Sequence, residues 1–257
     1  MSIFLKNAAQ ISAMREVGKV VFNVHEAIKK QIVPGVTTHE LERISIECLN
    51  EHNAVSSFFG YEGSFGAGKY PAHVCISLNE EVIHGIPGLR KLVDGDIVSI
   101  DVGAYKNGFH ADAARSYIAG NANADDKRLV EETEASFWKG LEFAKVSHRL
   151  FDISEAIDEH VKAHGFSIIR DFVGHGIGKN LHEAPEIPNY RPIGKGRGVR
   201  LEPGMTLAVE PMVAAGAYEV KILPDLWTVV TKDGRKSAHY ENTILITDGE
   251  PEILTVY

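Results

Sequence analysis

Cysteine is scarce in this chain, long apolar runs are missing, and positive charge is outnumbered by negative charge. Cys48 and Cys75 are the only cysteines among 257 residues, which excludes a disulfide framework and fits a reducing compartment. No stretch approaches the roughly 18 uninterrupted apolar residues that a membrane helix needs, and the first residues contain no long apolar signal region. We therefore expect a cytoplasmic protein without a membrane segment.

The charge balance excludes further classes of protein. Lys and Arg together number 27 against 35 Asp and Glu, which gives a formal net charge of −8. Without a local basic patch, a general affinity for nucleic acid or for an anionic membrane is not expected. The length and a hydrophobic content of 44% allow one sizeable core, as one large domain or two fused halves. We expect a monomer with a single domain over 1–257.

The chain contains the same helical plan twice. In the first half, apolar residues at steps of three or four from Ile11 to Ile28 predict a helix, and Thr37 with Glu40 has the capping-box pattern of a second. In the second half, helices are predicted near 124–145 and from about 152 to 164. We therefore predict two pseudo-repeat halves, about 1–122 and 123–257.

The predicted strands repeat as well. Residues 92–101 (LVDGDIVSID) align with residues 201–210 (LEPGMTLAVE), each a turn with glycine followed by an apolar strand that ends in an acid. The offset of 109 positions makes Glu210 the counterpart of Asp101. Such a duplication places two similar halves face to face, with a shared site at their junction. Strands mixed with helices in each half indicate an α/β (α+β) fold.

Asn107-Gly108 is a strong signal for a two-residue hairpin turn, because a type I′ turn needs positive φ at both central positions. Such a turn pairs Asp101 with Ala114. It places Asp112 on the same face as Asp101 and diagonal to it, at roughly 7–8 Å between backbones. Two carboxylates at that separation can share metal ions. Because side chains alternate between the two faces of a strand, His110 also lies on this face.

Two glutamates of the second half have comparable settings. Glu210 precedes Pro211, so its strand ends there or lies at a sheet edge. Glu241 comes just before the apolar run 244–246, and Asp233-Gly234 marks a second predicted hairpin ahead of it. Either glutamate alone is more often structural than functional, but the aspartate pair of the first half shifts that balance.

Three histidines lie in unusual settings. His175 is flanked by glycines in the segment FVGHGIGKNLH, which lets backbone and ligand approach closely. Imidazole is a common metal ligand and a general acid or base near neutral pH. His182 follows seven residues later, and His84 lies in the apolar segment EVIHGIP. These histidines are therefore candidates for the same cavity.

Five side chains with metal-binding groups are Asp101, Asp112, His175, Glu210 and Glu241. Each lies in a short apolar stretch, where a charged or imidazole group needs a partner. Four oxygen ligands and one nitrogen ligand suit divalent ions such as Co²⁺, Mn²⁺, Fe²⁺ or Zn²⁺. The sequence therefore predicts a metal cluster that activates water for hydrolysis.

Six separated motifs resemble the type I methionine aminopeptidases, in that family's order and at its spacings. The motifs are NEEVIHGIP, GDIVSIDVG, GFHADAARSY, GHGIGKNLHEAPEIPNY, LEPGMTLAVEP and SAHYENTILIT. The resemblance covers nearly the whole chain. It implies the pita-bread fold, in which two pseudo-symmetric halves share a central antiparallel sheet flanked by helices. It also implies an enzyme that removes the N-terminal methionine from peptides and nascent proteins.

The resemblance implies roles for single residues. The five predicted ligands become a two-metal centre in which Asp112 and Glu241 bridge and Glu210 also accepts a proton. His182 would contact the developing oxyanion, and His84 the amide nitrogen that becomes the leaving amine. A free substrate α-amine at one metal would restrict cleavage to the first residue. For the methionine pocket, the resemblance implies Phe58, Tyr61, Tyr70, Cys75, Leu181 and Trp227.

Two features depart from the family pattern. A glycine-rich insertion at residues 63–69 precedes Tyr70, and we expect it to reshape the rim of the pocket. It reads GxxxxGK like a phosphate loop, but Tyr70 replaces the Ser or Thr that would bind Mg²⁺. His239 stands where the family usually has glutamine, and it can support a ligand or bind metal itself.

Two of the implied pocket residues, Phe58 and Trp227, fit less well with the rest of the sequence. Phe58 stands where related sequences often have a small or sulfur side chain. A simple turn at Asp233-Gly234 would put Trp227 on the face opposite Glu241. Either that turn is longer, a bulge intervenes, or Trp227 is not a pocket residue.

Other interpretations of the same residues remain open. An Xaa-Pro aminopeptidase or prolidase would use the same five ligands, but those enzymes have an additional N-terminal domain. A binding module of the same fold would lack ligands. A mononuclear iron oxygenase could use His110, Asp112 and His175, which leaves the other three acids unexplained. The implied partner is the N-terminal methionine of a peptide or nascent chain, and the ribosome is a further candidate.

Overall fold

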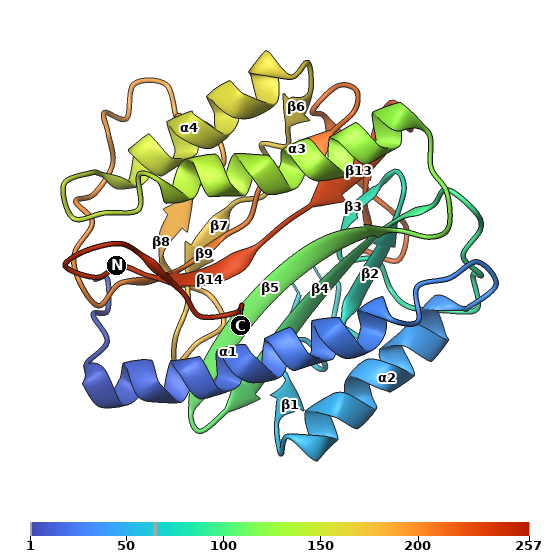
Figure 1. Cartoon of the computed structure of the whole chain (residues 1–257), viewed down its shortest axis with the longest axis horizontal. Helices are drawn as coiled ribbons and strands as arrows, with labels where there is room; N and C mark the ends of the chain where they lie inside the picture. The colour runs from blue at the N-terminus through green and yellow to red at the C-terminus, as the bar shows by residue number, and fades with distance from the viewer. Residues whose placement is uncertain (1, 64–65, 257) are drawn as a thin grey trace.

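Two pairs of helices cover the strands that run through the middle of the molecule (Figure 1). The structure is a computed structural model that describes residues 2–63 and 66–256. The helices are α1 (Ala8–Lys29), α2 (Thr38–Glu51), α3 (Ala124–Leu141) and α4 (Leu150–Ala163). The first pair packs on the strands of the first half, and the second pair lies across the molecule from it (Figure 1). The two-helix plan predicted for each half is confirmed.

The strands form four sheets in the described part of the chain. One sheet contains β1 (Val55–Ser56), β2 (Cys75–Leu78), β4 (Ile97–Lys106) and β5 (Phe109–Ile118). A second contains β7 (Gly174–Gly176), β8 (Glu183–Ile187), β9 (Thr206–Val209), β14 (Asn242–Leu245) and β15 (Glu252–Ile253). A third, smaller sheet contains β3 (Glu81–Ile83), β11 (Val220–Ile222) and β12 (Val229–Thr231). The fourth contains β6 (Ser167–Ile168), β10 (Met212–Ala214) and β13 (Ser237–His239). Every strand pair is antiparallel.

Local sequence explains where the helices begin and end. The capping box predicted at the start of α2 is present, since Thr37 Oγ1 accepts from the Glu40 N–H at 3.1 Å and Glu40 Oε2 accepts from the Thr37 N–H at 2.7 Å. Helix α3 ends at Leu141, four residues short of the predicted end, because the Phe143 and Ala144 amides donate to carbonyls only three residues back. Gly165 follows α4 with φ +78°, as a helix-ending glycine does.

The hairpin between β4 and β5 has the predicted register. Asn107 and Gly108 have φ +53° and +84°, and Asp101 pairs with Ala114. Asp112 pairs directly with Gly103, which leaves the two aspartates diagonal to each other on neighbouring strands. This relationship between the carboxylates follows from the turn alone.

The predicted repeat is also visible in backbone geometry. Gly95 and Gly204, which are equivalent in the repeat, have φ +88° and +91°. In both halves the residue after this glycine donates its N–H to the carbonyl three residues back, at 3.2 Å in the first half and 3.1 Å in the second. The strand that follows is β4 in the first half and β9 in the second. The same turn therefore starts the strand that leads to each acid.

The hairpin predicted at Asp233-Gly234 is wrong. The chain does turn there, with φ +73° at Gly234, but the strands on either side separate. Strand β12 pairs with β11 and β3, whereas β13 pairs with β10. Asp233 instead caps the loop, since its carboxylate accepts the amides of Ala217 at 2.8 Å and Arg235 at 3.0 Å. Because no hairpin forms here, counting alternate residues across the turn does not determine the position of Trp227.

The two halves join where β5 meets β13 and β14. The amide of Glu241 donates to the carbonyl of Ala114 at 2.9 Å, and Thr243 Oγ1 donates to the carbonyl of Asp112 at 2.9 Å. Arg115 donates to Asn242 Oδ1 at 2.6 Å across the same boundary. This junction brings acids from both halves together.

None of the helices in the described part of the chain combines the length and the apolar character that a membrane span requires.

Candidate metal centre and substrate cavity

The five predicted ligands converge at the junction of the halves. The ligand atoms of Asp112, His175 and Glu241 all lie within 4.8 Å of one another. The side chains of Asp101 and Asp112 interact directly. Glu210 Oε1 lies 3.6 Å from His175 Nε2, which links the fifth residue to the same cluster. Residues separated by up to 140 positions therefore share one site.

Strand register places each acid. Glu210 directly follows β9, and Glu241 directly precedes β14. Because Val209 pairs with Asn242, the two glutamates lie next to each other at the ends of paired strands. Strand β5 carries Asp112 to this point from the first half. The Pro after Glu210 cannot donate a ladder hydrogen bond, which fits the end of the strand there.

Burial and mutual repulsion act strongly on these carboxyl groups. Burial first, and the Asp112 charge second, raise the pKa of Asp101, Glu210 and Glu241 well above their usual values. Burial raises the pKa of Asp112 to about 6. Among the described residues, Asp101 Oδ1, Asp112 Oδ1 and Glu241 Oε1 are buried without a hydrogen-bond partner. Buried carboxyl oxygens that the protein leaves unpaired are the donor set that divalent cations satisfy.

The glycines around His175 allow close strand packing. A Cβ at Gly174 would lie 2.4 Å from the carbonyl oxygen of Ala208, and one at Gly176 would lie 2.2 Å from that of Ala184. His175 Nδ1 lies 2.9 Å from the Gly176 carbonyl oxygen, so the Nδ1–H donates and Nε2 keeps its lone pair. Burial lowers the pKa of His175 to about 3, so the ring is neutral. A neutral imidazole with a free Nε2 facing Glu210 is suited to bind metal.

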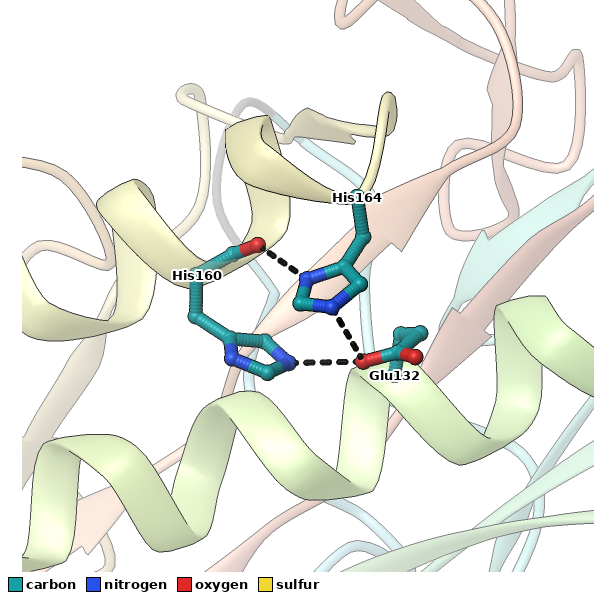
Figure 2. A group of neighbouring side chains, drawn as sticks. All are labelled: Glu132, His160 and His164. Atoms are coloured by element: carbon teal, nitrogen blue, oxygen red, sulfur yellow. Dashed lines mark hydrogen bonds and ion pairs between the residues drawn. The ribbon is translucent and has the colours of Figure 1, made fainter.

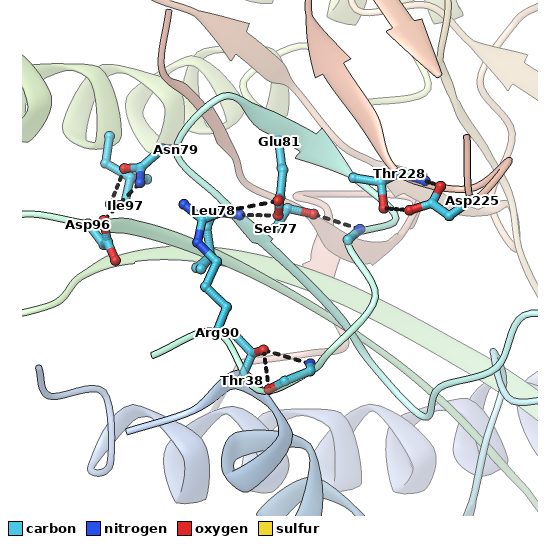
Figure 3. Close-up of polar contacts among 12 residues, drawn as sticks. Thr38, Ser77, Leu78, Asn79, Glu81, Arg90, Asp96, Ile97, Asp225 and Thr228 are labelled. Carbon is cyan, nitrogen blue, oxygen red and sulfur yellow. Dashed lines mark hydrogen bonds and ion pairs between the residues drawn. The ribbon is translucent and has the colours of Figure 1, made fainter. Parts of the chain in front are cut away.

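His84 is held both by its ring, which packs edge to face against Phe172 and Trp227, and by the backbone on either side of it. Its backbone has φ +59°, a conformation uncommon for a side chain other than glycine. The next residue, Gly85, accepts from the Ile76 amide at 2.9 Å and donates to Ser77 Oγ at 3.0 Å. Figure 3 shows the bond to Ser77 Oγ. It also shows Glu81, whose carboxylate accepts hydrogen bonds from the Leu78 amide and from Arg90 and so stabilises the preceding turn. The strained residue is therefore fixed from both sides, as is common at functional sites.

Comparison with known proteins identifies the family. The family model of Metallopeptidase family M24 matches residues 12–248. A methionine aminopeptidase of Clostridium perfringens is 52% identical over 255 residues, which cover 99% of each protein. The crystal structure of a methionine aminopeptidase from Thermotoga maritima superposes with a TM-score of 0.94 at 43% identity and covers 100% of each chain. The chain belongs to metallopeptidase family M24.

Membership of family M24 confirms the resemblance found in the sequence and the pita-bread fold that it implied. It also implies a hydrolase that uses divalent metal. The prolidase of Pyrococcus furiosus superposes with a TM-score of 0.75 at 20% identity, and the match covers only 65% of that chain. That likeness concerns the fold alone.

A cavity of 380 Å³ opens above the acids of this M24 metallopeptidase. All six residues predicted for the pocket line it, namely Phe58, Tyr61, Tyr70, Cys75, Leu181 and Trp227. His84, His182 and four of the five predicted ligands also line it, whereas Glu241 does not. Trp227 reaches the cavity because Asp225 caps its turn, accepting the Trp227 amide at 2.9 Å and bonding Thr228 (Figure 3). Trp227 therefore lines the cavity, as the resemblance implied, because the hairpin that would have placed it on the opposite face does not form.

Several lining residues were missed by sequence reasoning. They are Ile83, Asp171, Phe172, Val173, Ile222, Leu226 and Val229. The apolar residues just before Gly174 and beside His84 could have been found, since they adjoin two predicted motifs. Ile222 and Leu226 could not, because nothing in their local pattern shows that β11 and its loop close over the cavity.

Gly63 and Ala67 of the inserted segment line the cavity, as expected. A Cβ at Gly63 would lie 2.6 Å from the Trp227 ring, so glycine permits this contact. Ser64 and Phe65 lie outside the described residues. After Lys69 the chain continues to strand β2 rather than into a helix, so the phosphate-loop interpretation is wrong.

His239 is buried beside the predicted ligands of the M24 site. It is 2% exposed, and its Nε2 lies 3.6 Å from Glu210 Oε2. Within the described part of the chain this Nε2 has no hydrogen-bond partner. The ligand atoms of Glu210, His239 and Glu241 form a second group within 4.8 Å. Burial lowers the pKa of His239 to about 3, so its ring is neutral.

The iron-triad interpretation is not supported by the position of His110. Its Nδ1 lies 2.8 Å from Ser57 Oγ, and its ring packs at 4.7 Å from that of Tyr105. His110 belongs to neither of the two buried donor groups found among the described residues. Its parity with Asp112 places it on the same strand face but not at the acids.

Proposed function

We propose that this protein is a methionine aminopeptidase that removes the N-terminal methionine from peptides and nascent chains. The observation that carries the proposal is the convergence of four acids and a neutral His175 beside a cavity, which is lined by Asp101, Asp112, Glu210 and His175. The identity to proteins named methionine aminopeptidases over nearly the full chain supports the substrate. We further propose that the whole chain, 1–257, acts as one catalytic domain in the cytoplasm.

The predicted ligands would hold two divalent ions, with Co²⁺, Mn²⁺, Fe²⁺ and Zn²⁺ as candidates. Asp112 and Glu241 are suited to bridge, because Asp112 interacts with Asp101 while Glu241 belongs to both donor groups. When bound, such ions lower the pKa of a coordinated water and polarise the scissile carbonyl. The repulsion that raises the carboxyl pKa values is the local cost that bound cations would offset.

The chain's own groups then have separable tasks. Glu210, whose pKa is raised by burial, is suited to accept and hold a proton. Burial lowers the pKa of His84 to about 4 and also lowers that of His182. Both rings are therefore neutral near pH 7 and can donate hydrogen bonds, His182 to the oxyanion and His84 to the leaving-amine side. We expect His182→Ala to lower kcat by about 10²–10³.

The cavity suits a methionine side chain. Its lining combines apolar groups with the Cys75 thiol and the rings of Tyr70 and Trp227, which meet edge to face at 5.0 Å. A thioether packs favourably at aromatic edges. Phe58 narrows one wall, since it stands against Gly103, where a Cβ would lie 2.6 Å from its ring. Selection of the first residue would follow from recognition of the free α-amine at the metal side of the cavity.

A peptide panel tests the function. Met-Ala-, Leu-Ala-, Met-Pro- and N-blocked Met-Ala- peptides are incubated with the protein and each divalent ion, and products are identified by mass. We expect release of the first methionine only, and none from the blocked peptide. Cleavage of the blocked peptide, or cleavage confined to Xaa-Pro bonds in dipeptides, would overturn the proposal in favour of another peptidase activity.

A further inference from the structure

Two histidines and a glutamate meet between α3 and α4 (Figure 2), and none of them lines the cavity. Glu132 lies on α3, His160 lies in the last turn of α4, and His164 directly follows that helix. Glu132 Oε2 is 2.8 Å from His160 Nε2 and 3.5 Å from His164 Nε2. Their three ligand atoms all lie within 4.8 Å of one another. None of these residues belongs to the proposed catalytic centre.

The hydrogen bonds of His164 leave its outer nitrogen as an acceptor. His164 Nδ1 lies 2.8 Å from the carbonyl oxygen of His160, so Nδ1 carries the proton and donates it. In the neutral ring, Nε2 then directs a lone pair at Glu132 Oε2, which also only accepts. Two acceptors facing each other at 3.5 Å are stabilised by a cation between them, either a proton or a metal ion.

The spacing favours a metal ion. Imidazoles four residues apart on a helix lie on one face, and these two rings have centroids 4.3 Å apart. Ligands on a tetrahedral Zn²⁺, at about 2.0–2.1 Å from the ion, lie roughly 3.3 Å from each other. The 3.5 Å pair already fits, and the 2.8 Å pair needs only a small opening. The side chains are 13%, 21% and 38% exposed for His160, Glu132 and His164, which allows entry and a water ligand.

The electrostatic setting is mixed but favourable. Both histidines lie at the C-terminal end of α4, where the helix dipole attracts positive charge. Glu132 supplies a full negative charge. Arg128 opposes a cation, but its guanidinium is engaged with the His164 carbonyl oxygen at 3.3 Å and with the Phe166 ring at 4.8 Å.

We propose that Glu132, His160 and His164 form a surface site for a nitrogen-preferring divalent ion such as Zn²⁺, which joins α3 to α4. Two imidazoles and one carboxylate make up a set that Zn²⁺, Ni²⁺ and Cu²⁺ prefer over Mg²⁺ or Ca²⁺. The ion would bind both helices of the second half at once. It would therefore stabilise the packing of α3 on α4 without touching the substrate cavity.

The test compares variants of the whole protein. Metal-free wild type, His164→Ala and the control His148→Ala are titrated with Zn²⁺ against a chromophoric chelator. His148 is a suitable control because it lies at the other end of α4 and approaches a single carboxylate, Asp152, at 3.5 Å. We expect wild type and His148→Ala to bind one more ion per chain than His164→Ala. This difference does not depend on how many ions the catalytic centre holds.

A second measurement keeps the test independent of stoichiometry. Cu²⁺ added to the protein should give an electron paramagnetic resonance signal with hyperfine splitting from two imidazole nitrogens, and that pattern should be lost in His160→Ala. Zn²⁺ should also raise the Tm of wild type more than that of Glu132→Gln. Equal ion counts and equal Tm shifts across wild type, His164→Ala and Glu132→Gln would overturn the proposal and leave only hydrogen bonds within this cluster.

Discussion

The hydroxyl oxygen of Tyr61 lies 2.7 Å from Nδ1 of His182. The two residues are 121 positions apart, and their rings meet edge to face at 5.3 Å. Burial lowers the pKa of His182, so its ring is neutral and carries one N–H. We assign the tautomer in which Nδ1 accepts the Tyr61 hydroxyl, since it is the one that leaves an N–H for the cavity. The ring proton then resides on Nε2. Tyr61 therefore positions His182 as a hydrogen-bond donor toward the cavity.

Replacement of Tyr61 by phenylalanine tests this relationship. We expect Tyr61→Phe to lower kcat roughly 3- to 30-fold with little change in KM, because the tautomer that donates to the oxyanion is no longer favoured. Tyr105→Phe is the matched control, since Tyr105 also contacts a histidine but lies outside the cavity lining. An unchanged kcat, or a change confined to KM, would show that Tyr61 serves only as a pocket wall.

The metal-free protein should lose stability as the pH rises above 7. In the folded protein, burial holds the pKa of Asp101, Glu210 and Glu241 well above the value of about 4 expected in the unfolded chain. A folded-state pKa above the unfolded value stabilises the protein at low pH, and this contribution is lost as pH rises through the folded pKa. Buried site histidines act in the opposite sense, but only below about pH 6.5.

We therefore expect the urea midpoint of the chelated protein to fall as the pH rises beyond about 6.5, where the histidines no longer titrate and only the raised carboxyl groups still do. Glu241→Gln removes one of the repelling groups, so the urea midpoint of this variant should fall less steeply over the same pH range. Saturating divalent metal should abolish the pH dependence in wild type. A midpoint that stays level or rises in the chelated wild type would contradict the raised pKa values.

His239 should contribute to metal binding. We expect His239→Gln to weaken binding of Zn²⁺ or Co²⁺ by about 10- to 100-fold and to affect Mn²⁺ less, because the lost group is an imidazole with an unpartnered Nε2 beside Glu210. Ion affinity measured by isothermal titration gives the answer directly. The same loss for all three ions would indicate that His239 only orients Glu210.

Phe58 should restrict the size of the first side chain. We expect Phe58→Cys to raise the kcat/KM for Leu-Ala- relative to Met-Ala- peptides by about 10-fold, because the smaller residue widens the wall opposite Gly103. Competition between the two peptides in one reaction measures the ratio. A ratio equal to that of wild type would exclude Phe58 as a determinant of selectivity.

Much of the site could be predicted because its geometry is local. The turn at Asn107-Gly108 fixes the relation of Asp101 to Asp112, and repeated turns place Gly95 and Gly204 before equivalent strands. Where partners are distant in the sequence, prediction failed. The strands beside Asp233 looked like a hairpin, but each pairs with a strand from elsewhere. Such pairing depends on tertiary packing that a local pattern does not contain.

The cavity roof was missed for the same reason. Ile222 and Leu226 belong to a short strand and a loop with no distinctive spacing, and β12 places them by pairing with β3 from the first half. The Tyr61–His182 contact likewise joins distant segments. Motifs therefore identified the chemistry, whereas the surroundings required the structure.

Methionine release as a function of bound metal tests the central claim most directly. Chelated protein receives increasing Co²⁺ or Mn²⁺, and free methionine from a Met-Ala- peptide is measured alongside the number of bound ions. We expect no release without metal, release that rises as the site fills, and none at any metal level in Asp112→Asn. Methionine release by the chelated protein, or undiminished release by Asp112→Asn, would contradict a metal centre built on these acids.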